Sequence, residues 1–348
     1  MNYPFMEFLN TIQKPWKILA PMVGNSEKPY RILARNHNAD LCYTEMVNCK
    51  AFNKNKCSPT DNQWYTIGDR PLVIQICGDD VDEMVKTCLT IQDYCDAIDI
   101  NFGCPQDIAK KGHYGSFLQD EWDLIFKIVS SCAQAIRIPL FCKIRIFESI
   151  EKTVEYAKLF EKAGASLLAV HGRTREQKGM NTGLASWEHI KAVKNTLSIP
   201  VIANGNLIYY ENIQECFEFT GADGVMIAEP HLYNPCIFCK KPLNALEIYD
   251  EFLNILKDEK NIFYGGLKSH SFKIFHTIFV KLPYLRIILD KSKCLQDYIN
   301  FGSLLKSLLK ENVIDENDLV MKPYVRSNSL SQTVLLPNEV SEAECSKV

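Results

Sequence analysis

Short apolar runs alternate with stretches of helical spacing over the first two thirds of the chain. The runs predict strands over residues 17–22, 41–46, 71–77, 97–102, 139–146, 167–173, 200–205 and 224–229. Between them, apolar residues recurring every three or four positions predict helices over 27–37, 81–94, 121–136, 149–163, 187–197 and 210–219. This alternation of eight strands with helices predicts an α/β protein with a closed (β/α)8 TIM barrel, not an open doubly wound sheet.

The strand pattern stops after residue 242. Helical apolar spacing continues over 246–258, 267–282 and 294–312, which predicts a small all-helical C-terminal domain. We therefore expect a barrel domain over 1–242, a helical domain over 243–315 and a flexible tail over 316–348, which is rich in Asn, Ser and Glu.

Composition narrows the class of protein. With 348 residues, of which 47% are hydrophobic and 23% charged, the chain can bury a large core. We expect neither export nor membrane insertion, because residues 1–15 lack a signal-peptide pattern and no apolar run approaches the length of a membrane span. Fourteen cysteines without a disulfide framework predict a reducing compartment, the cytoplasm, with the nucleus as a further location. A net charge of −3 means that any nucleic-acid binding would rest on a local basic patch.

The carboxyl ends of the strands of such a barrel face one pocket, so the polar residues there form a candidate site. They are Glu45, Gln75, Asn101, Lys143, Arg145, His171, Arg173, Asn204 and Glu229. Cys104 follows the strand 97–102 between a glycine and a proline, and a polar, glycine-bearing loop comes next. The pattern indicates a displayed, functional thiol, although a cysteine can also serve as a small hydrophobe under a turn.

A second group of residues suits a phosphorylated cofactor. Asn204, Gly205 and Asn206 follow the seventh strand, where such barrels often bind phosphate, and glycine lets the backbone approach an anion closely. Lys143 could stabilise negative charge on the pyrimidine edge of a flavin, and Gln75 could offer a donor and an acceptor to the same ring.

Several short motifs resemble those of one family. They are Ala20-Pro-Met22, Gln75, Asn101-Phe-Gly-Cys-Pro105, Gly112-His-Tyr-Gly115, Lys143-Ile-Arg145, His171-Gly-Arg173, Asn204-Gly205 and Gly224-Val-Met226. In these motifs and their order the chain closely resembles the tRNA-dihydrouridine synthases, which are FMN enzymes that reduce uridine in tRNA. The resemblance spans residues 17–240 and continues more weakly through Lys268-Ser-His-Ser-Phe-Lys273.

Four further segments resemble the eukaryotic branch that modifies D-loop positions 16 and 17. They cover residues 93–99, 108–114, 118–122 and 185–190. The chain departs from many family members after the eighth strand, where Ala228 and Glu229 replace a Gly-Arg pair. This replacement removes a guanidinium from the expected phosphate loop, so backbone donors must contribute more there.

The resemblance implies a reaction and a role for each site residue. NADPH, or NADH, would reduce FMN, which would pass a hydride to C6 of a uracil turned out of the tRNA D-loop, while the Cys104 thiol gives a proton to C5. The implied cofactor contacts are Pro21, Met22, Val23, Gln75, Lys143, His171, Asn204, Gly205, Asn206, Ala228 and Glu229. The implied substrate contacts are Asn101, Lys110, Lys111, Arg145, Arg173 and Arg175. No metal and no protein partner are implied.

Two other functions remain open at this point. An FMN barrel resembling dihydroorotate dehydrogenase would reduce a free pyrimidine, but such a substrate does not require the helical domain. A non-catalytic tRNA-binding factor would be expected to have lost Cys104 or Lys143, and both are present. Cys236 and Cys239 have the spacing of half a zinc site, and without a second pair nearby we expect no metal there.

Overall fold

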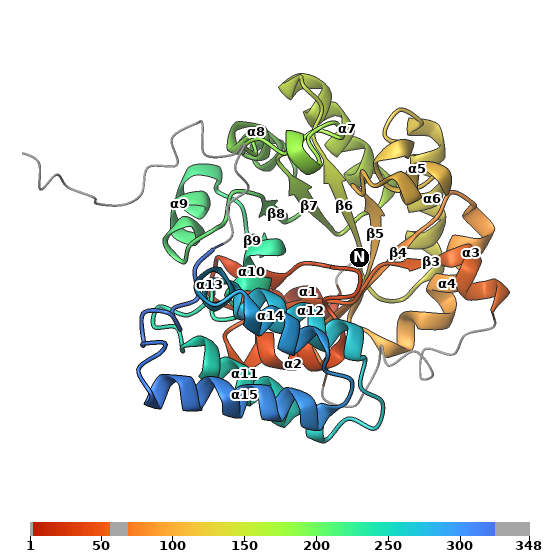
Figure 1. The fold of residues 1–348 in the computed structure, drawn as a ribbon. Coiled ribbons are helices and arrows are strands. Elements are labelled where there is room, and N and C mark those ends of the chain that lie inside the picture. The colour runs from red at the N-terminus through yellow and green to blue at the C-terminus, as the bar shows by residue number, and fades with distance from the viewer. Residues whose placement is uncertain (1–2, 56–68, 324–348) are drawn as a thin grey trace, which may run out of the picture.

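The computed structural model describes residues 3–55 and 69–323, and eight parallel strands form a closed barrel within them (Figure 1). These strands are β1 (Trp16–Leu19), β2 (Leu41–Tyr43), β4 (Leu72–Cys77), β5 (Ala97–Phe102), β6 (Leu140–Arg145), β7 (Leu167–His171), β8 (Val201–Asn204) and β9 (Gly224–Ile227). Their order is β2-β1-β9-β8-β7-β6-β5-β4, and pairing of β2 with β4 completes the ring. The predicted (β/α)8 barrel is confirmed.

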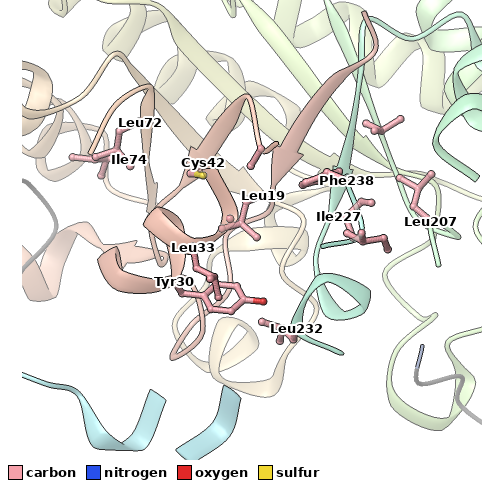
Figure 2. Packing of buried hydrophobic residues seen from close by; sticks show 14 of the residues in the cluster. Leu19, Tyr30, Leu33, Cys42, Leu72, Ile74, Leu207, Ile227, Leu232 and Phe238 are labelled. Carbon is pink, nitrogen blue, oxygen red and sulfur yellow. The ribbon is translucent and has the colours of Figure 1, made fainter. Parts of the chain in front are cut away.

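Helices surround the barrel on its outer side. They are α2 (Lys28–Asn36), α4 (Val81–Ile91), α6 (Trp122–Ala135), α7 (Ile150–Ala163), α8 (Trp187–Thr196) and α9 (Glu211–Thr220). Outward-facing strand residues pack against them, as Leu19 and Cys42 do beside Tyr30 and Leu33 of α2 (Figure 2). Both faces of each strand are therefore covered, which explains why the strands are nearly continuous apolar runs.

The inward-facing residues form a separate apolar cluster inside the barrel. It includes Ile18, Val73, Phe141, Leu167 and Ile202. Helix α1 (Pro4–Thr11) closes the amino-terminal end of the barrel, where Leu9 is buried and the Phe5 ring lies 6.4 Å from that of Phe141. This helix is absent from the sequence prediction.

Some short elements also differ from the prediction. The strand expected over 41–46 ends at Tyr43, and its continuation is a separate two-residue strand, β3 (Val47–Asn48), that pairs only with β4 and leads into α3 (Cys49–Lys54). The loop after β5 contains α5 (Asp107–Lys111) and the 3-10 turn η2 (Gly115–Leu118). The remaining short elements are η1 (Gln92–Tyr94), η3 (Gly179–Asn181) and α10 (Glu229–Tyr233).

The C-terminal helices pack against one side of the barrel, next to α2 (Figure 1). They are α11 (Ala245–Lys257), α12 (Tyr264–Ile274), α13 (His276–Lys281), α14 (Tyr284–Asp290) and α15 (Leu295–Lys310). The helix predicted over 267–282 is wrong as a single element, because the chain divides it at Phe275 into α12 and α13, and α14 was missed.

The chain remains packed beyond the predicted end of the helical domain at residue 315. Leu319 is fully buried, and its carbonyl accepts a hydrogen bond from the backbone N–H of Ala245 at 2.9 Å. The rest of the predicted tail, residues 324–348, lies outside the described residues, and the division into domains stays a prediction. Over the described ranges, no helix has the length and apolar character required to cross a membrane.

Candidate active site

A layer of polar side chains lies inside the barrel above the apolar cluster. Because side chains alternate along a strand, the positions that follow Val73, Ala97 and Phe141 by two residues also point inward. These positions hold Gln75, Asp99 and Lys143, and the next inward positions hold Asn101 and Arg145. His171 and Asn204 occupy the corresponding ends of β7 and β8, where they pair in register. The fold thus brings the predicted strand-end residues to one end of the barrel.

A cavity of about 300 Å³ opens at this end. Ten of the predicted site residues line it: Pro21, Lys143, Arg145, His171, Arg173, Asn204, Gly205, Asn206, Ala228 and Glu229. Gln75 lies within the barrel at 1% exposure, whereas Val23 is 66% exposed in the loop after β1, and neither lines the cavity. Met22, Asn101, Cys104, Lys110, Lys111 and Arg175 are also outside its lining, although Pro105 and Gln106, which follow Cys104, belong to it.

Positive charge is concentrated around the cavity. Burial and the nearby Arg145 lower the pKa of Lys143 to about 8, while Asp99 opposes this shift. Burial, Arg145, Lys143 and Arg173 together lower the pKa of His171 well below its usual value, so that its imidazole is neutral near pH 7. Lys143 makes no ion pair with the acidic residues that the structure describes. The cavity is therefore suited to bind an anionic ligand.

The turn after β8 has the close backbone approach that an anion site requires. Gly205 has a φ of +114°, and a Cβ there would lie 2.6 Å from Cβ of Ala185 and 3.2 Å from Cδ2 of His171. The side chain of Asn206 fixes the turn, since its Oδ1 accepts from the Ala185 N–H at 2.9 Å and its Nδ2 donates to the Ala185 carbonyl at 2.8 Å. Only glycine fits at position 205 without displacing these groups.

A chain of hydrogen bonds runs from the barrel interior to Cys104. Oδ1 of Asn101 accepts from the backbone N–H groups of Gly103 at 3.0 Å and Cys104 at 2.8 Å. Its Nδ2 donates to Oε1 of Gln75 at 2.9 Å, and Nε2 of Gln75 donates to Oδ2 of Asp99 at 2.8 Å. Burial raises the pKa of Asp99 to about 7. Since both acceptor sites of Asn101 are used, its second amide N–H is the polar group left to meet a substrate.

The loop after β5 holds Cys104 from the other side. The Ser116 backbone N–H and hydroxyl both donate to the Cys104 carbonyl, at 3.1 and 2.9 Å, and Nε of Arg145 donates to the Gly103 carbonyl at 2.9 Å. Cys104 is partly exposed, in contrast to the buried Cys77 that packs in the same small cluster. The alternative in which Cys104 is a buried hydrophobe is thereby disfavoured.

The outer basic residues fall into two groups. Nη1 of Arg175 donates to Oδ2 of Asp120 at 2.9 Å and to the Ser116 carbonyl at 3.3 Å, so this side chain joins the loops after β5 and β7. Lys110 and Lys111 are exposed on α5. Their exposure leaves them accessible to a large polyanion, and their contact with a substrate stays a prediction.

Comparison with known proteins assigns the chain to a family. The family model described as Dihydrouridine synthase (Dus) matches residues 18–307, which begin within β1 and include the rest of the barrel and most of the C-terminal helices. The chain belongs to the dihydrouridine synthase family. It is 43% identical over 323 residues to the Mus musculus protein named tRNA-dihydrouridine(16/17) synthase [NAD(P)(+)]-like, which covers 89% of this chain and 68% of that protein.

Two fungal proteins named tRNA-dihydrouridine(16/17) synthase [NAD(P)(+)] are similarly related. The Schizosaccharomyces pombe protein is 43% identical over 323 residues, covering 87% of this chain and 80% of its own length. The Saccharomyces cerevisiae protein is 44% identical over 284 residues, covering 77% and 67% respectively. The predicted resemblance to this family, and to its 16/17 branch, is confirmed.

The structure bears on the family arginine that Glu229 replaces in this dihydrouridine synthase. Nη2 of Arg173 donates to Oδ1 of Asn206 at 3.1 Å, and its Nη1 lies 3.1 Å from Nε2 of His171. The Arg173 guanidinium lies beside the glycine turn after β8, and its predicted contact with the substrate stays a prediction. The turn after β8 therefore has a guanidinium beside it that comes from the loop after β7.

The C-terminal helices of this family member support the loop after β1. Ser269 and Lys273 of α12 both donate to Oδ1 of Asn25, at 2.8 and 3.0 Å, and His270 pairs with Glu27 at 2.9 Å. This loop carries Pro21, Met22 and Val23. The sequence did not indicate the contact between α12 and this loop. It also did not indicate the hydrogen bond between Asp99 and Gln75, although the inward position of Asp99, two residues before Asn101, could have identified it.

Proposed function

We propose that this chain is a tRNA-dihydrouridine synthase that reduces the C5–C6 double bond of D-loop uridines at positions 16 and 17, with FMN in the cavity and NADPH or NADH as reductant. Family membership and the names of the three relatives support the reaction class and the substrate. The observation that carries the proposal is the partly exposed Cys104 beside a cationic cavity at the carboxyl ends of the barrel strands.

The cavity residues fit FMN. The Gly205 turn, Asn206 and Arg173 would hold the phosphate, because glycine lets the backbone approach an anion closely and a guanidinium lies beside the turn. Lys143, for which no partner is described, would face the negative edge of the ring, with Gln75 beneath it. Pro21, Ala228 and Glu229 would form the rim, with Met22 and Val23 in the adjoining loop after β1, and neutral His171 would lie next to the phosphate turn. When bound, FMN would supply the hydride that reduces C6.

Cys104 would act as the general acid. Its thiol would donate a proton to C5 of the uracil, so that hydride and proton together saturate the C5–C6 bond. Asn101 accepts one hydrogen bond from the Gly103 N–H and one from the Cys104 N–H, and would use its remaining amide N–H to orient the base. Arg145 is a positioning residue, since its Nε donates to the Gly103 carbonyl and its Nη1 to the Thr174 carbonyl at 2.7 Å.

Substrate recognition would extend beyond the cavity. A uracil must leave its stack to reach the barrel end, which costs least in a loop such as the tRNA D-loop. Lys110 and Lys111 on α5 would meet phosphates near the target base, and the helical region over 243–315 would bind more of the tRNA. We place the activity in the cytoplasm, with the nucleus as a second compartment, because the chain carries many unpaired thiols.

The absorbance spectrum of the purified protein, followed by NADPH consumption, tests this function. We expect flavin bands, and consumption that requires unmodified tRNA and yields dihydrouridine at positions 16 and 17. Consumption supported by orotate or uracil without tRNA would favour the reductase of free pyrimidines. A protein that binds tRNA but neither holds flavin nor consumes NADPH would be the non-catalytic factor.

A further inference from the structure

Two cysteines outside the cavity lie together where the barrel meets the C-terminal helices. Cys236 and Cys239 belong to the connection between α10 and α11. The backbone N–H of Cys239 donates to the Cys236 carbonyl at 2.8 Å, and that of Ile237 donates to the Asn234 carbonyl at 3.0 Å, which makes two successive tight turns. Such a turn brings its first and last Cα atoms within about 7 Å, close to the range that a disulfide requires.

The two thiols differ in access. Cys239 is partly exposed, whereas Cys236 is buried behind it at 1% exposure. The sulfur of Cys239 accepts a hydrogen bond from Nδ2 of Asn38 at 3.3 Å and interacts with the thiol of Cys236. The hydrogen bond from Cys236, together with His37 and against the effect of burial, lowers the pKa of Cys239 to about 5. An accessible sulfur therefore has a lowered pKa and a second thiol beside it, which favours reaction as the thiolate.

His37 joins this pair to both parts of the protein. Its Nδ1 lies 3.4 Å from Sγ of Cys236, and its Nε2 lies 2.8 Å from Oε2 of Glu251 on α11. The Cys239 thiol also donates to the His37 carbonyl at 3.5 Å, and Lys17 of β1 adds a more distant positive charge. The cysteine pair thus has a charged environment of its own, made by β1, α2 and α11.

We propose that Cys236 and Cys239 form a redox-active dithiol that a hydroperoxide converts to a disulfide. The Cys239 thiolate attacks one peroxide oxygen, the O–O bond breaks, and the departing oxygen takes a proton and leaves as water or an alcohol. Sγ of Cys236 then attacks the sulfenic acid on Cys239, which forms the S–S bond and releases water with the Cys236 proton. The two thiols lose two electrons in total and one peroxide gains them, so no further reactant is needed.

Metal binding is the competing use of such a pair. A stable zinc site needs about four ligands, and the described residues contain no group of three or more His, Cys, Asp or Glu side chains arranged for a metal ion. The dithiol does not depend on the proposed tRNA reaction, because none of its residues lines the cavity.

Mass spectrometry of the full-length protein tests the proposal. The protein is treated with one equivalent of hydrogen peroxide, unfolded, alkylated with iodoacetamide and digested with trypsin. The peptide 195–240 contains three cysteines, Cys216, Cys236 and Cys239. We expect it to carry one carbamidomethyl group and to have lost two hydrogens, and to carry three such groups after dithiothreitol.

Variants then assign the two roles. Cys236→Ser should leave a sulfenic acid on Cys239 that dimedone traps, and Cys239→Ser should abolish oxidation of the peptide. The control Cys294→Ser removes an exposed distant thiol and should leave the oxidation of the peptide unchanged. The proposal is overturned if the wild-type peptide keeps three alkylated cysteines at a dose that oxidises Cys294, or if zinc remains bound to the purified protein at Cys236 and Cys239. The wild-type measurement decides even where a variant fails to fold.

Discussion

Gly115 offers a direct test of how the loop after β5 positions Cys104. Gly115 has a φ of +68°, and a Cβ added there would lie 2.7 Å from the carbonyl oxygen and 2.9 Å from Cβ of Cys104. Both distances are shorter than real Cβ contacts, and two of the three nearest atoms belong to the Cys104 backbone. Gly115→Ala must therefore displace Cys104 or the turn that faces it.

The size of the effect follows from the geometry. Restoring ordinary contact requires a shift of roughly 0.5–1 Å at Cys104, and a displacement of about 1 Å in a reacting group can lower a rate about 100-fold. The left-handed φ costs about 1 kcal/mol for alanine, and overpacking adds about 1–3 kcal/mol. We expect Gly115→Ala to lose about 2–4 kcal/mol of unfolding free energy and about 100-fold in the rate of uridine reduction, with tRNA affinity nearly unchanged.

Gly221→Ala is the matched control. Gly221 ends α9 with a φ of +66°, but a Cβ there would have nothing within 4 Å. It should lose only about 1 kcal/mol of stability and no activity. Rates come from single-turnover reoxidation of the reduced enzyme by unmodified tRNA at a temperature where both variants are folded. If Gly115→Ala reduces uridine as fast as Gly221→Ala, the close packing of Gly115 on Cys104 does not position the thiol and our reasoning is refuted.

Three further predictions concern buried polar groups. The Tyr30 hydroxyl donates to the His231 carbonyl at 2.8 Å and lies 3.0 Å from Nδ1 of His231. Tyr30→Phe should therefore lower the unfolding free energy, measured in urea titrations, by about 1–3 kcal/mol. The control Tyr156→Phe removes a buried hydroxyl for which no partner is described, and it should not lower the unfolding free energy. The folded state lowers the pKa of Lys143 to about 8, so above this pH an anionic ligand binds with uptake of a proton by Lys143. FMN affinity, measured by fluorescence, should fall up to about tenfold between pH 8 and 9. The variant Lys143→Met should show no such fall. Burial raises the pKa of Asp99 to about 7, so the folded state retains a proton that the unfolded state loses near pH 4. The unfolding free energy should therefore decline by up to about 4 kcal/mol between pH 4 and 7. Asp99→Asn should remove that decline. An equal decline in Asp99→Asn would assign it to other groups.

The barrel and its polar layer were predictable because each depends on local spacing. The strands are buried on both faces, so they appear as apolar runs, and a period of two places Gln75, Asn101 and Lys143 on the same inner side. Helix α1 could not be predicted as a barrel element, because its role depends on the amino-terminal end of a barrel that forms only when distant strands close. The break between α12 and α13 at Phe275 likewise follows from tertiary packing, since helical spacing continues through it.

The hydrogen bonds of Arg173 could not be predicted from its motif. Arg173 ends the sixth predicted strand, and the family resemblance implies a substrate contact there, which stays a prediction. The structure turns its guanidinium toward Asn206 at 3.1 Å and toward the Gly183 carbonyl, also at 3.1 Å, because the loops after β7 and β8 are neighbours in the ring. Which loop a long side chain reaches depends on those neighbours and not on its own sequence context.

The most direct test of the central claim compares Cys104→Ala with Cys294→Ala in the reoxidation of the reduced enzyme by unmodified tRNA. If Cys104 protonates C5 beside the cofactor cavity, Cys104→Ala should slow tRNA-dependent reoxidation by about 100-fold or more while tRNA affinity is retained, because general acid catalysis contributes about 10² to 10⁴. Cys294→Ala should react like the wild type, since this exposed thiol precedes α15, remote from the barrel cavity. Reoxidation of Cys104→Ala at the wild-type rate would contradict the account.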